Sequence, residues 1–301
     1  PGRPRYRPNQ VRWAFASGEI GWNRDRRRPN TGRRRFYLNQ QLTVDGHRSP
    51  MTLKTALLQG AELLTRDGVP EPRLTAEVLL CFALRRERIY LYSHPEHELT
   101  TLEWLHFGRY LHERLKGKPT QYITKRQEFW GREFRVTPDV LIPRPETEHS
   151  VERALEVARG ARRVLDIGTG SGALAVTLAL ELQPELTVAS DLSLNALRVA
   201  RGNALSLGAR VEFVQCDLST GVGGTFDLIV SNPPYIPEHE ISRLQREVRD
   251  WEPRLALSGG ADGVQPYLRI VPDAQRLLHP GGWLIFEIGY QGEAAIRAAF
   301  G

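Results

Sequence analysis

The chain has 301 residues, of which 41% are hydrophobic and 25% charged, an ordinary composition for a globular protein that is long enough to hold two domains. No apolar run approaches the roughly 18 to 20 residues that a membrane helix needs, so we expect no membrane association. The two cysteines, Cys81 and Cys216, lie far apart and outside any Cys-x-x-Cys pair. This spacing argues against a disulfide framework or a zinc site, so we expect a reducing, cytoplasmic compartment and no metal.

The net charge of +6 is distributed unevenly along the chain. Residues 1–50 carry twelve arginines, no lysine and three acids, a net charge of +9, whereas residues 51–301 carry −3. The basic segment has no helical or strand period, and its Pro, Gly, Asn and Arg content predicts a disordered leader. Helical periodicity begins directly after Met51, the chain's only methionine, so one interpretation places residues 1–50 outside the functional fold. The alternative is an arginine-rich arm that contacts RNA on a ribosome.

Residues 51–119 have the pattern of a small helical bundle. Apolar residues recur at three- and four-residue spacing from Leu53 to Leu64, and Gly68 ends this helix. Thr100 and Glu103 form a capping-box pattern at the start of another helix. The helix that starts at this capping box is predicted to cover residues 100–116, and another helix is predicted over residues 73–84.

Past residue 120 the pattern changes to alternating strands and helices. We expect a linker or hairpin over residues 120–148 and a second domain over 149–301. Continuous apolar strands separated by helices predict a Rossmann-like α/β fold, with a mostly parallel sheet covered on both faces. The predicted strands cover residues 162–168, 186–191, 211–217, 226–231 and 282–289.

Three of these strand ends carry candidate ligand-binding residues. The first is followed by "DIGTGSG", Asp166 to Gly172, whose glycines allow close backbone approach to a ligand at a helix N-terminus. Asp191 ends the next strand, where a carboxylate meets ribose hydroxyls, and Asp217 ends the third, in reach of an adenine edge. The pattern therefore indicates a nucleoside-containing cofactor. The G-x-G-x-G spacing departs from the dinucleotide fingerprint, although Ala173 could fill its last position, so a dehydrogenase stays open at this point.

The stretch "SNPPYIP", residues 231–237, follows a fourth apolar strand. Asn232 offers a carbonyl acceptor, and the prolines after it fix carbonyls that have no competing N–H donor. Tyr235 adds an aromatic face. Such a site suits a planar group that bears an NH₂, because both hydrogens can be bonded while the plane is stacked. The coincidence with "DIGTGSG" in one sheet favours methyl transfer from S-adenosylmethionine onto a planar nitrogen.

"DIGTGSG" and "SNPPYIP" together resemble the amino-methyltransferases. The segment "QEFWGREFRVTPDVLIPRPETE", residues 127–148, is similar to one family among them, the release-factor glutamine methyltransferases. "WEPRLALSGGADG" and "PGGWLIFEIG" resemble the same family, and the similarity runs from about residue 51 to residue 301. This resemblance implies a class I S-adenosylmethionine-dependent methyltransferase domain after a helical substrate-binding domain. It also implies the substrate, which is the side-chain N5 of the glutamine in the Gly-Gly-Gln loop of class 1 peptide-chain release factors.

The resemblance implies roles for individual residues. Asn232, Pro233 and Tyr235 would be the catalytic residues. Arg144, Glu146 and Thr147 would lie beside the cofactor or shape the pocket, although a salt-bridged linker is an equal interpretation of these three. The substrate amide would contact Asn232, Pro233, Pro234 and Tyr235. The cofactor would contact Asp166, Gly168, Thr169, Gly170, Ser171, Gly172, Asp191, Asp217, Leu218 and Asn232.

The sequence departs from the family pattern in two places. Lys125 stands in "QYITK" where the family has a glycine, which puts the local turn in doubt. The chain also ends at Gly301, soon after "FEIG", so we expect a sheet that lacks the family's last antiparallel strands and has an open edge.

Two related activities remain as alternatives. One is methylation of a ribosomal-protein glutamine, and the other is methylation of adenine N6 in a nucleic acid, where a flipped base would use the same pocket. The charge of −3 outside the basic segment argues against nucleic acid, because phosphate contacts need basic groups. A non-enzymatic cofactor binder is disfavoured by the intact Asn232-to-Tyr235 motif.

Overall fold

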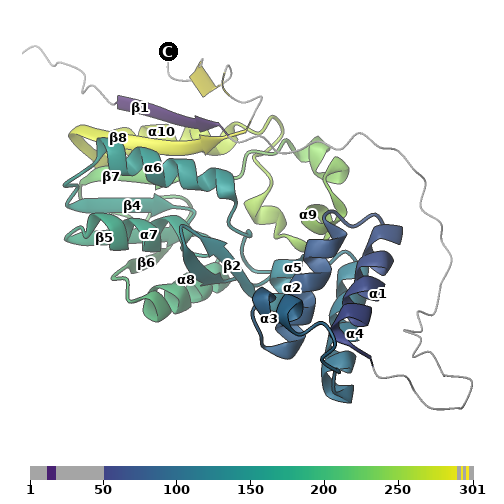
Figure 1. Cartoon of the computed structure of the whole chain (residues 1–301). Helices are drawn as coiled ribbons and strands as arrows, with labels where there is room; N and C mark the ends of the chain where they lie inside the picture. Colours follow the sequence, from purple (N-terminus) through teal and green to yellow (C-terminus); the bar gives the residue numbers. More distant parts are fainter. Residues whose placement is uncertain (1–11, 18–50, 290–292, 294–295, 298–301) are drawn as a thin grey trace, which may run out of the picture. The chain divides into compact units, whose positions relative to one another are not determined.

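The computed structural model describes residues 12–17, 51–289, 293 and 296–297, and these divide into two compact units (Figure 1). One unit is helical and comprises the described residues up to Thr124, starting at residue 51. The other begins at Lys125 and also contains residues 12–17. The helical unit thus extends five residues beyond the predicted boundary at residue 119. No described helix is both long and apolar enough to cross a bilayer.

The helical unit packs around a single apolar core. The predicted capping box is confirmed, because the Thr100 hydroxyl accepts from the Glu103 backbone N–H and the Glu103 carboxylate accepts from the Thr100 N–H. Position 60, inside the first helix, is a glycine that leaves room for Phe107. A Cβ at this position would stand 2.7 Å from the Phe107 ring. The helices are α1 Leu53–Arg66, α2 Pro72–Leu84, α3 Arg88–Ser93, α4 Thr101–Leu115 and α5 Thr120–Thr124.

The second unit is built on a six-stranded sheet in the order β1-β8-β7-β4-β5-β6, and every neighbouring pair is parallel. The predicted parallel α/β fold is therefore confirmed. The strands of this sheet are β1 Arg12–Ser17, β4 Arg163–Ile167, β5 Leu186–Asp191, β6 Glu212–Gln215, β7 Phe226–Ser231 and β8 Leu278–Ile288. A separate antiparallel hairpin consists of β2 Arg126–Phe129 and β3 Arg132–Arg135.

Helices cover both faces of the sheet because alternate strand residues point to opposite sides. Val164, Val230 and Ile285 pack in one apolar cluster with residues of α6 and α7, whereas Leu165 and Phe286 pack in another with α10. The principal helices of this unit are α6 Glu148–Val157, α7 Ala173–Leu182, α8 Leu194–Leu207, α9 Arg246–Trp251 and α10 Gln265–Leu277.

Strand β1 corrects part of the predicted disorder of residues 1–50. Residues 12–17, "RWAFAS", pair in parallel with β8 in the register Arg12 to Trp283 through Ser17 to Ile288. The outer edge of β8 offers backbone N–H and C=O groups that a further strand can pair with, so the edge that we expected to be open is covered. The rest of residues 1–50 lies outside the described residues.

The turn at Lys125 keeps the geometry that a glycine would adopt. Lys125 has a φ of 62°, in the left-handed region, and its carbonyl accepts a 3.2 Å hydrogen bond from the Val136 N–H. The departure from the family pattern thus preserves the turn, at the conformational cost that a side chain with a Cβ has in this region.

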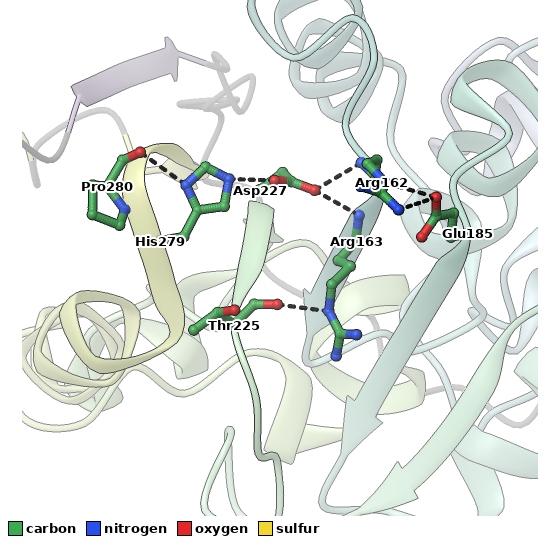
Figure 2. Close-up of polar contacts among 7 residues, drawn as sticks. All are labelled: Arg162, Arg163, Glu185, Thr225, Asp227, His279 and Pro280. Carbon is green, nitrogen blue, oxygen red and sulfur yellow. Dashed lines mark hydrogen bonds and ion pairs between the residues drawn. The ribbon is translucent and has the colours of Figure 1, made fainter.

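A polar cluster ties together the amino ends of β4, β7 and β8 (Figure 2). Asp227 Oδ2 accepts from the backbone N–H groups of Arg162 and Arg163, at 2.7 and 2.8 Å. His279 donates to Asp227 Oδ1 through Nε2 and lies 2.8 Å from the Pro280 carbonyl through Nδ1. Because both ring nitrogens lie against oxygen acceptors, the Pro280 carbonyl and Asp227 raise the pKa of His279.

Candidate active site

The candidate site lies at the carboxyl ends of β4, β5, β7 and β8. Parallel strands place their carboxyl ends at one edge of the sheet, and the loops that follow them form the binding crevice of such folds. Each of these four strand ends leads into a polar residue or a glycine-rich turn, at Gly168, Asp191, Asn232 and Gly289.

The turn after β4 has a backbone that only glycine adopts without strain. Gly168, Gly170 and Gly172 have φ values of 74°, 55° and 83°. A Cβ on Gly172 would lie 3.1 Å from the Cβ of Ala200, so this glycine also lets α7 and α8 pack closely. A Cβ on Gly168 or Gly170 would meet no described atom within 4 Å. These two glycines therefore border open space, which a ligand can approach along the backbone.

Asp191, at the end of β5, organises the same turn. Its Oδ2 accepts from the Gly170 N–H at 2.9 Å and its Oδ1 from the Ser193 N–H at 2.8 Å. Burial raises the pKa of Asp191, and these backbone hydrogen bonds oppose the shift. Each carboxylate oxygen keeps a second lone pair, so Asp191 retains the capacity to accept hydrogen bonds from a diol such as ribose.

Asp166 lies beneath the turn with one oxygen unsatisfied. Its Oδ2 accepts from the Thr169 hydroxyl at 2.6 Å and the Ala175 N–H at 3.1 Å. Its Oδ1 is buried and has no hydrogen-bond partner among the described residues. Burial raises the pKa of Asp166 to about 7. The ammonium group of the methionine moiety in S-adenosylmethionine would donate to such an oxygen, so this acceptor fits the expected cofactor.

The turn after β6 places the two other expected cofactor residues differently. Asp217 is half-exposed and accepts from Arg269 at 2.6 Å. Leu218, with a φ of 52°, packs against the apolar cluster that contains Ile167. Leu218 therefore packs against the apolar core, whereas the carboxylate of Asp217 is engaged by an ion pair.

Asn232 is joined to a buried carboxylate through Thr147. Its Nδ2 lies 3.0 Å from the Thr147 hydroxyl, which lies 2.7 Å from Glu287 Oε2. Among the described residues, no hydrogen bond is formed by Asn232 Oδ1 or by the Pro233 carbonyl. The site thus presents two acceptors next to each other in sequence, and the side chain that carries one of them is held in place.

Tyr235 is fixed from three sides. Its hydroxyl donates to Glu287 Oε1 at 3.2 Å, and burial, followed by the charge of Glu287, raises its pKa far above the usual range. A Cβ on Gly289 would lie 2.8 Å from the tyrosine ring, and a Cβ on Gly263 would overlap the Tyr235 carbonyl oxygen. The next residue, Ile236, pairs with the loop at Leu257 through a 3.0 Å backbone hydrogen bond. The loop after α9 therefore needs its glycines to pack against this turn.

Arg144 forms an ion pair rather than a free pocket group. Its guanidinium donates to Glu252 Oε1 at 2.5 Å, and the Glu252 side chain is 1% exposed. Burial raises the pKa of Glu252 and the charge of Arg144 opposes the shift. Glu146 lies on the same segment and adds to the negative charge around Tyr235 and Glu287. Of the three residues from "PRPETE", Thr147 is the one with a hydrogen bond to Asn232 among the described contacts.

The sequence reasoning missed Glu287, Glu252 and the glycines at 263 and 289. A usable signal existed for Glu287, because it is the one charged residue in the apolar run "WLIFEI" of β8. An acid in a buried strand needs partners, and it stands at the carboxyl end of that strand.

Comparison with known proteins identifies both units. Residues 55–124 match the PrmC N-terminal domain family and residues 152–251 match the methyltransferase small domain family. A release factor glutamine methyltransferase of Koribacter versatilis is 48% identical over 244 residues, which cover 80% of this chain and 87% of the relative. Its counterpart in Chlorobaculum tepidum is 46% identical over 263 residues, 83% of this chain and 88% of the relative. The Bacillus subtilis counterpart is 42% identical over 255 residues, 82% and 88%.

Among solved structures, the chain is similar to the crystal structure of a methyltransferase from Pyrococcus furiosus. The sequence identity is 22% and the TM-score 0.44, and the match covers 60% of this chain and 80% of the other.

Proposed function

Because the chain belongs to the family of release factor glutamine methyltransferases, we propose that it methylates the side-chain N5 of the glutamine in the Gly-Gly-Gln loop of class 1 release factors. The chain is an S-adenosylmethionine-dependent methyltransferase with the class I fold. Its activity would modulate translation termination at the step where the release factor acts.

The acceptor pair at Asn232 and Pro233 carries this proposal. A glutamine side chain ends in a planar NH₂ group, and its two hydrogens need two acceptors when they leave water. Asn232 Oδ1 and the Pro233 carbonyl are adjacent in sequence and unused by the described residues. Tyr235, fixed by Glu287 and the glycines around it, supplies a ring to cover the amide plane.

The chemistry follows from how these residues treat the amide nitrogen. S-adenosylmethionine would supply the methyl group from its sulfonium, so that the new N–C bond forms as the C–S bond breaks, the neutral thioether leaves and the nitrogen loses one hydrogen as a proton to solvent. An amide nitrogen is a poor nucleophile because its lone pair is delocalised. Acceptors at both hydrogens draw electron density towards the nitrogen and fix its direction, which favours attack by position and electrostatics. Pro234 keeps the turn rigid without adding a competing N–H.

We assign the cofactor to the turn after β4 and the strand ends beside it. The open backbone at Gly168 and Gly170 and the oxygens of Asp191 suit the amino-acid and ribose parts. The unsatisfied oxygen of Asp166 suits the ammonium group. Leu218 suits the apolar face of adenine. Thr169, Ser171, Gly172, Asp217 and Asn232 complete the proposed set.

We assign substrate binding to the helical unit. We also propose that the enzyme works in the cytoplasm. The two cysteines lie far apart in the sequence and outside any Cys-x-x-Cys pair, which fits a reducing compartment. The basic segment of residues 1–50 stands as a possible contact with RNA, and no other nucleic-acid contact is proposed.

One experiment tests the proposal against its alternatives. The full chain is incubated with methyl-labelled S-adenosylmethionine and, in separate reactions, a class 1 release factor, its Gly-Gly-Gln Gln→Ala variant, ribosomal protein and DNA. We expect label on the wild-type release factor and none on the Gln→Ala variant. Label confined to ribosomal protein or to DNA would overturn the assignment in favour of the corresponding alternative.

A further inference from the structure

The carboxylate of Glu287 is buried at the carboxyl end of β8 and has a specific set of partners. The residue is 2% exposed. Its Oε2 lies 2.7 Å from the Thr147 hydroxyl and its Oε1 lies 3.2 Å from the Tyr235 hydroxyl. Its backbone carbonyl accepts from the Tyr267 hydroxyl at 2.9 Å, which fixes the backbone from which the carboxylate projects. Each of the two carboxylate oxygens therefore faces one hydroxyl group.

This arrangement sets the direction of the hydrogen bonds that reach Asn232. A carboxylate only accepts, and a hydroxyl has one hydrogen. When Thr147 donates that hydrogen to Glu287, its lone pairs can only accept, so the group of Asn232 that faces Thr147 is the NH₂ donor. The oxygen of Asn232 then points away from Thr147, where an incoming amide would meet an acceptor.

We propose that Glu287 is a positioning residue that, acting through Thr147, holds the Asn232 side chain with its oxygen towards the substrate amide. The same carboxylate orients Tyr235 through its other oxygen, so one buried acid sets both side chains of the site. This inference rests on the proposed function, because it names the group that orients the residue assigned there to the glutamine.

The charged groups around Glu287 are compatible with this role. Burial raises the pKa of Glu287, the Thr147 and Tyr235 hydroxyl groups oppose the shift, Glu146 adds to it and Arg144 opposes it. The two hydroxyl donors offset part of the cost of burying the charge. Arg144 is itself paired with Glu252, so the hydroxyl groups are the direct partners of the acid.

Replacing the Glu287 carboxylate by an amide can reverse the direction of the hydrogen bonds between residue 287, Thr147 and Asn232. Gln at position 287 has one acceptor oxygen for the two hydroxyl groups, and its NH₂ is a donor. If that NH₂ faces Thr147, the Thr147 hydrogen becomes available to Asn232 Oδ1. The Asn232 amide can then turn and present its NH₂ to the substrate. Such a site accepts a carboxylate side chain better than it accepts an amide.

The test compares four variants of the full chain: Glu287→Gln, Thr147→Val, Thr147→Ser and Thr177→Val. Thr177 is the matched control, because its hydroxyl is also buried but has no hydrogen-bond partner among the described residues. The readouts are kcat and KM for a release factor, the Kd for S-adenosylmethionine, and the inhibition constant of a release factor whose loop glutamine is replaced by glutamate.

We expect Thr147→Val and Glu287→Gln to lower kcat about 10- to 100-fold, as displacement of a reacting group does, with the Kd for S-adenosylmethionine unchanged. Thr147→Ser keeps the hydroxyl and should restore most of kcat, and Thr177→Val should match the wild type. Glu287→Gln should also bind the glutamate-loop competitor more tightly, relative to the glutamine loop, by several-fold. That change in preference would not follow from a loss of packing alone.

The possible failures are distinguishable. A wild-type enzyme that leaves the release factor unlabelled would overturn the proposed function. A wild-type enzyme that labels it, with Thr147→Val and Glu287→Gln equally active and equally selective, would overturn the role of Glu287 and leave the proposed function intact.

Discussion

Strands β7 and β8 carry polar side chains at both of their ends, and the carboxylates at the two ends have opposite pKa shifts. At the amino end, burial acts on Asp227, but the N–H groups of Arg163 and Arg162 and the His279 ring outweigh it, so its pKa is lowered. At the carboxyl end, burial is the largest influence on Glu287 and its pKa is raised. The amino-end cluster thus stabilises the charge it contains and serves the fold. The carboxyl-end cluster holds a charge at a net cost, which is typical of functional sites.

The two ends of the strands should differ most in their effect on activity when the acceptor side chain of Asn232 is removed from the carboxyl end. Asn232→Ala should lower the methyl-transfer rate by about 100- to 1,000-fold, the scale seen when one preorganised polar contact to a reacting group is deleted. The Kd for S-adenosylmethionine, measured by calorimetry, should stay nearly unchanged, as should the free energy of unfolding. Asn232 is one of ten residues in the proposed cofactor set, so its loss alone should not abolish cofactor binding. Joint loss of cofactor binding and transfer would mean that Asn232 acts mainly on the cofactor rather than on the amide.

Two glycines with similar backbones allow the ends to be compared directly. Gly263 and Gly281 have φ values of 81° and 88°. A Cβ on Gly281, near the start of β8, meets nothing within 4 Å, whereas one on Gly263 overlaps the Tyr235 carbonyl. In denaturant titrations, both Gly→Ala variants should lose about 1–2 kcal/mol of unfolding free energy from left-handed strain, and Gly263→Ala should lose more because its Cβ overlaps a backbone atom. Gly263→Ala alone should also lose about tenfold or more in kcat; equal kcat for the two variants would show that Tyr235 tolerates displacement.

Breaking the amino-end cluster should affect stability without affecting chemistry. Asp227→Ala leaves the Arg162 and Arg163 N–H groups without their acceptor, so we expect a loss of about 1–3 kcal/mol in the free energy of unfolding. Asp227→Asn keeps an acceptor oxygen and should lose less. The activity of either variant, measured well below its melting temperature, should equal that of the wild type. A variant of Asp227 that stays folded but is inactive would contradict this expectation, because it would show that the cluster at the amino ends of the strands affects the site at their carboxyl ends.

The smallest expected effect is the pH dependence of the same cluster. The Pro280 carbonyl and Asp227 raise the pKa of His279 above its usual 6.5. A raised pKa in the folded state means that the stabilisation is fully present below about pH 6.5 and is lost as pH rises through the folded-state pKa. The stability difference between wild type and His279→Gln should therefore shrink as the pH rises above about 6.5. It should be below about 1 kcal/mol, since the ring is 44% exposed and such pairs are screened. A difference that grows with pH would contradict a charged His279.

The main elements and several site residues could be predicted from the sequence because they depend on local patterns. The predicted strand over 226–231 coincides with β7, and the predicted strand over 186–191 coincides with β5. Gly168 and Asn232 stand directly after buried strands, so their place at one edge of the sheet follows from parallel pairing alone. The roles of these residues in binding and transfer remain predictions.

The rest depends on contacts between distant parts of the chain. Thr147 and Glu287 are 140 residues apart, and no pattern within either segment indicates that they meet. Strand β1 comes from a segment whose composition predicts disorder, and it forms because β8 offers a free edge. Asp217 stands where a ligand-binding acid is expected, but Arg269 reaches it from α10.

In the proposed cofactor site, the unpaired oxygen of Asp166 would link cofactor binding to proton release. With a folded-state pKa of about 7, against 3.8 for an unperturbed aspartate, much of the cofactor-free enzyme carries a proton on this group at neutral pH. An ammonium partner favours the ionised form, so binding would expel that proton to solvent. The affinity for S-adenosylmethionine would then rise with pH up to about 7 and level off above it. In the proposed site, this one carboxyl group would release its proton to solvent when the methyl donor binds.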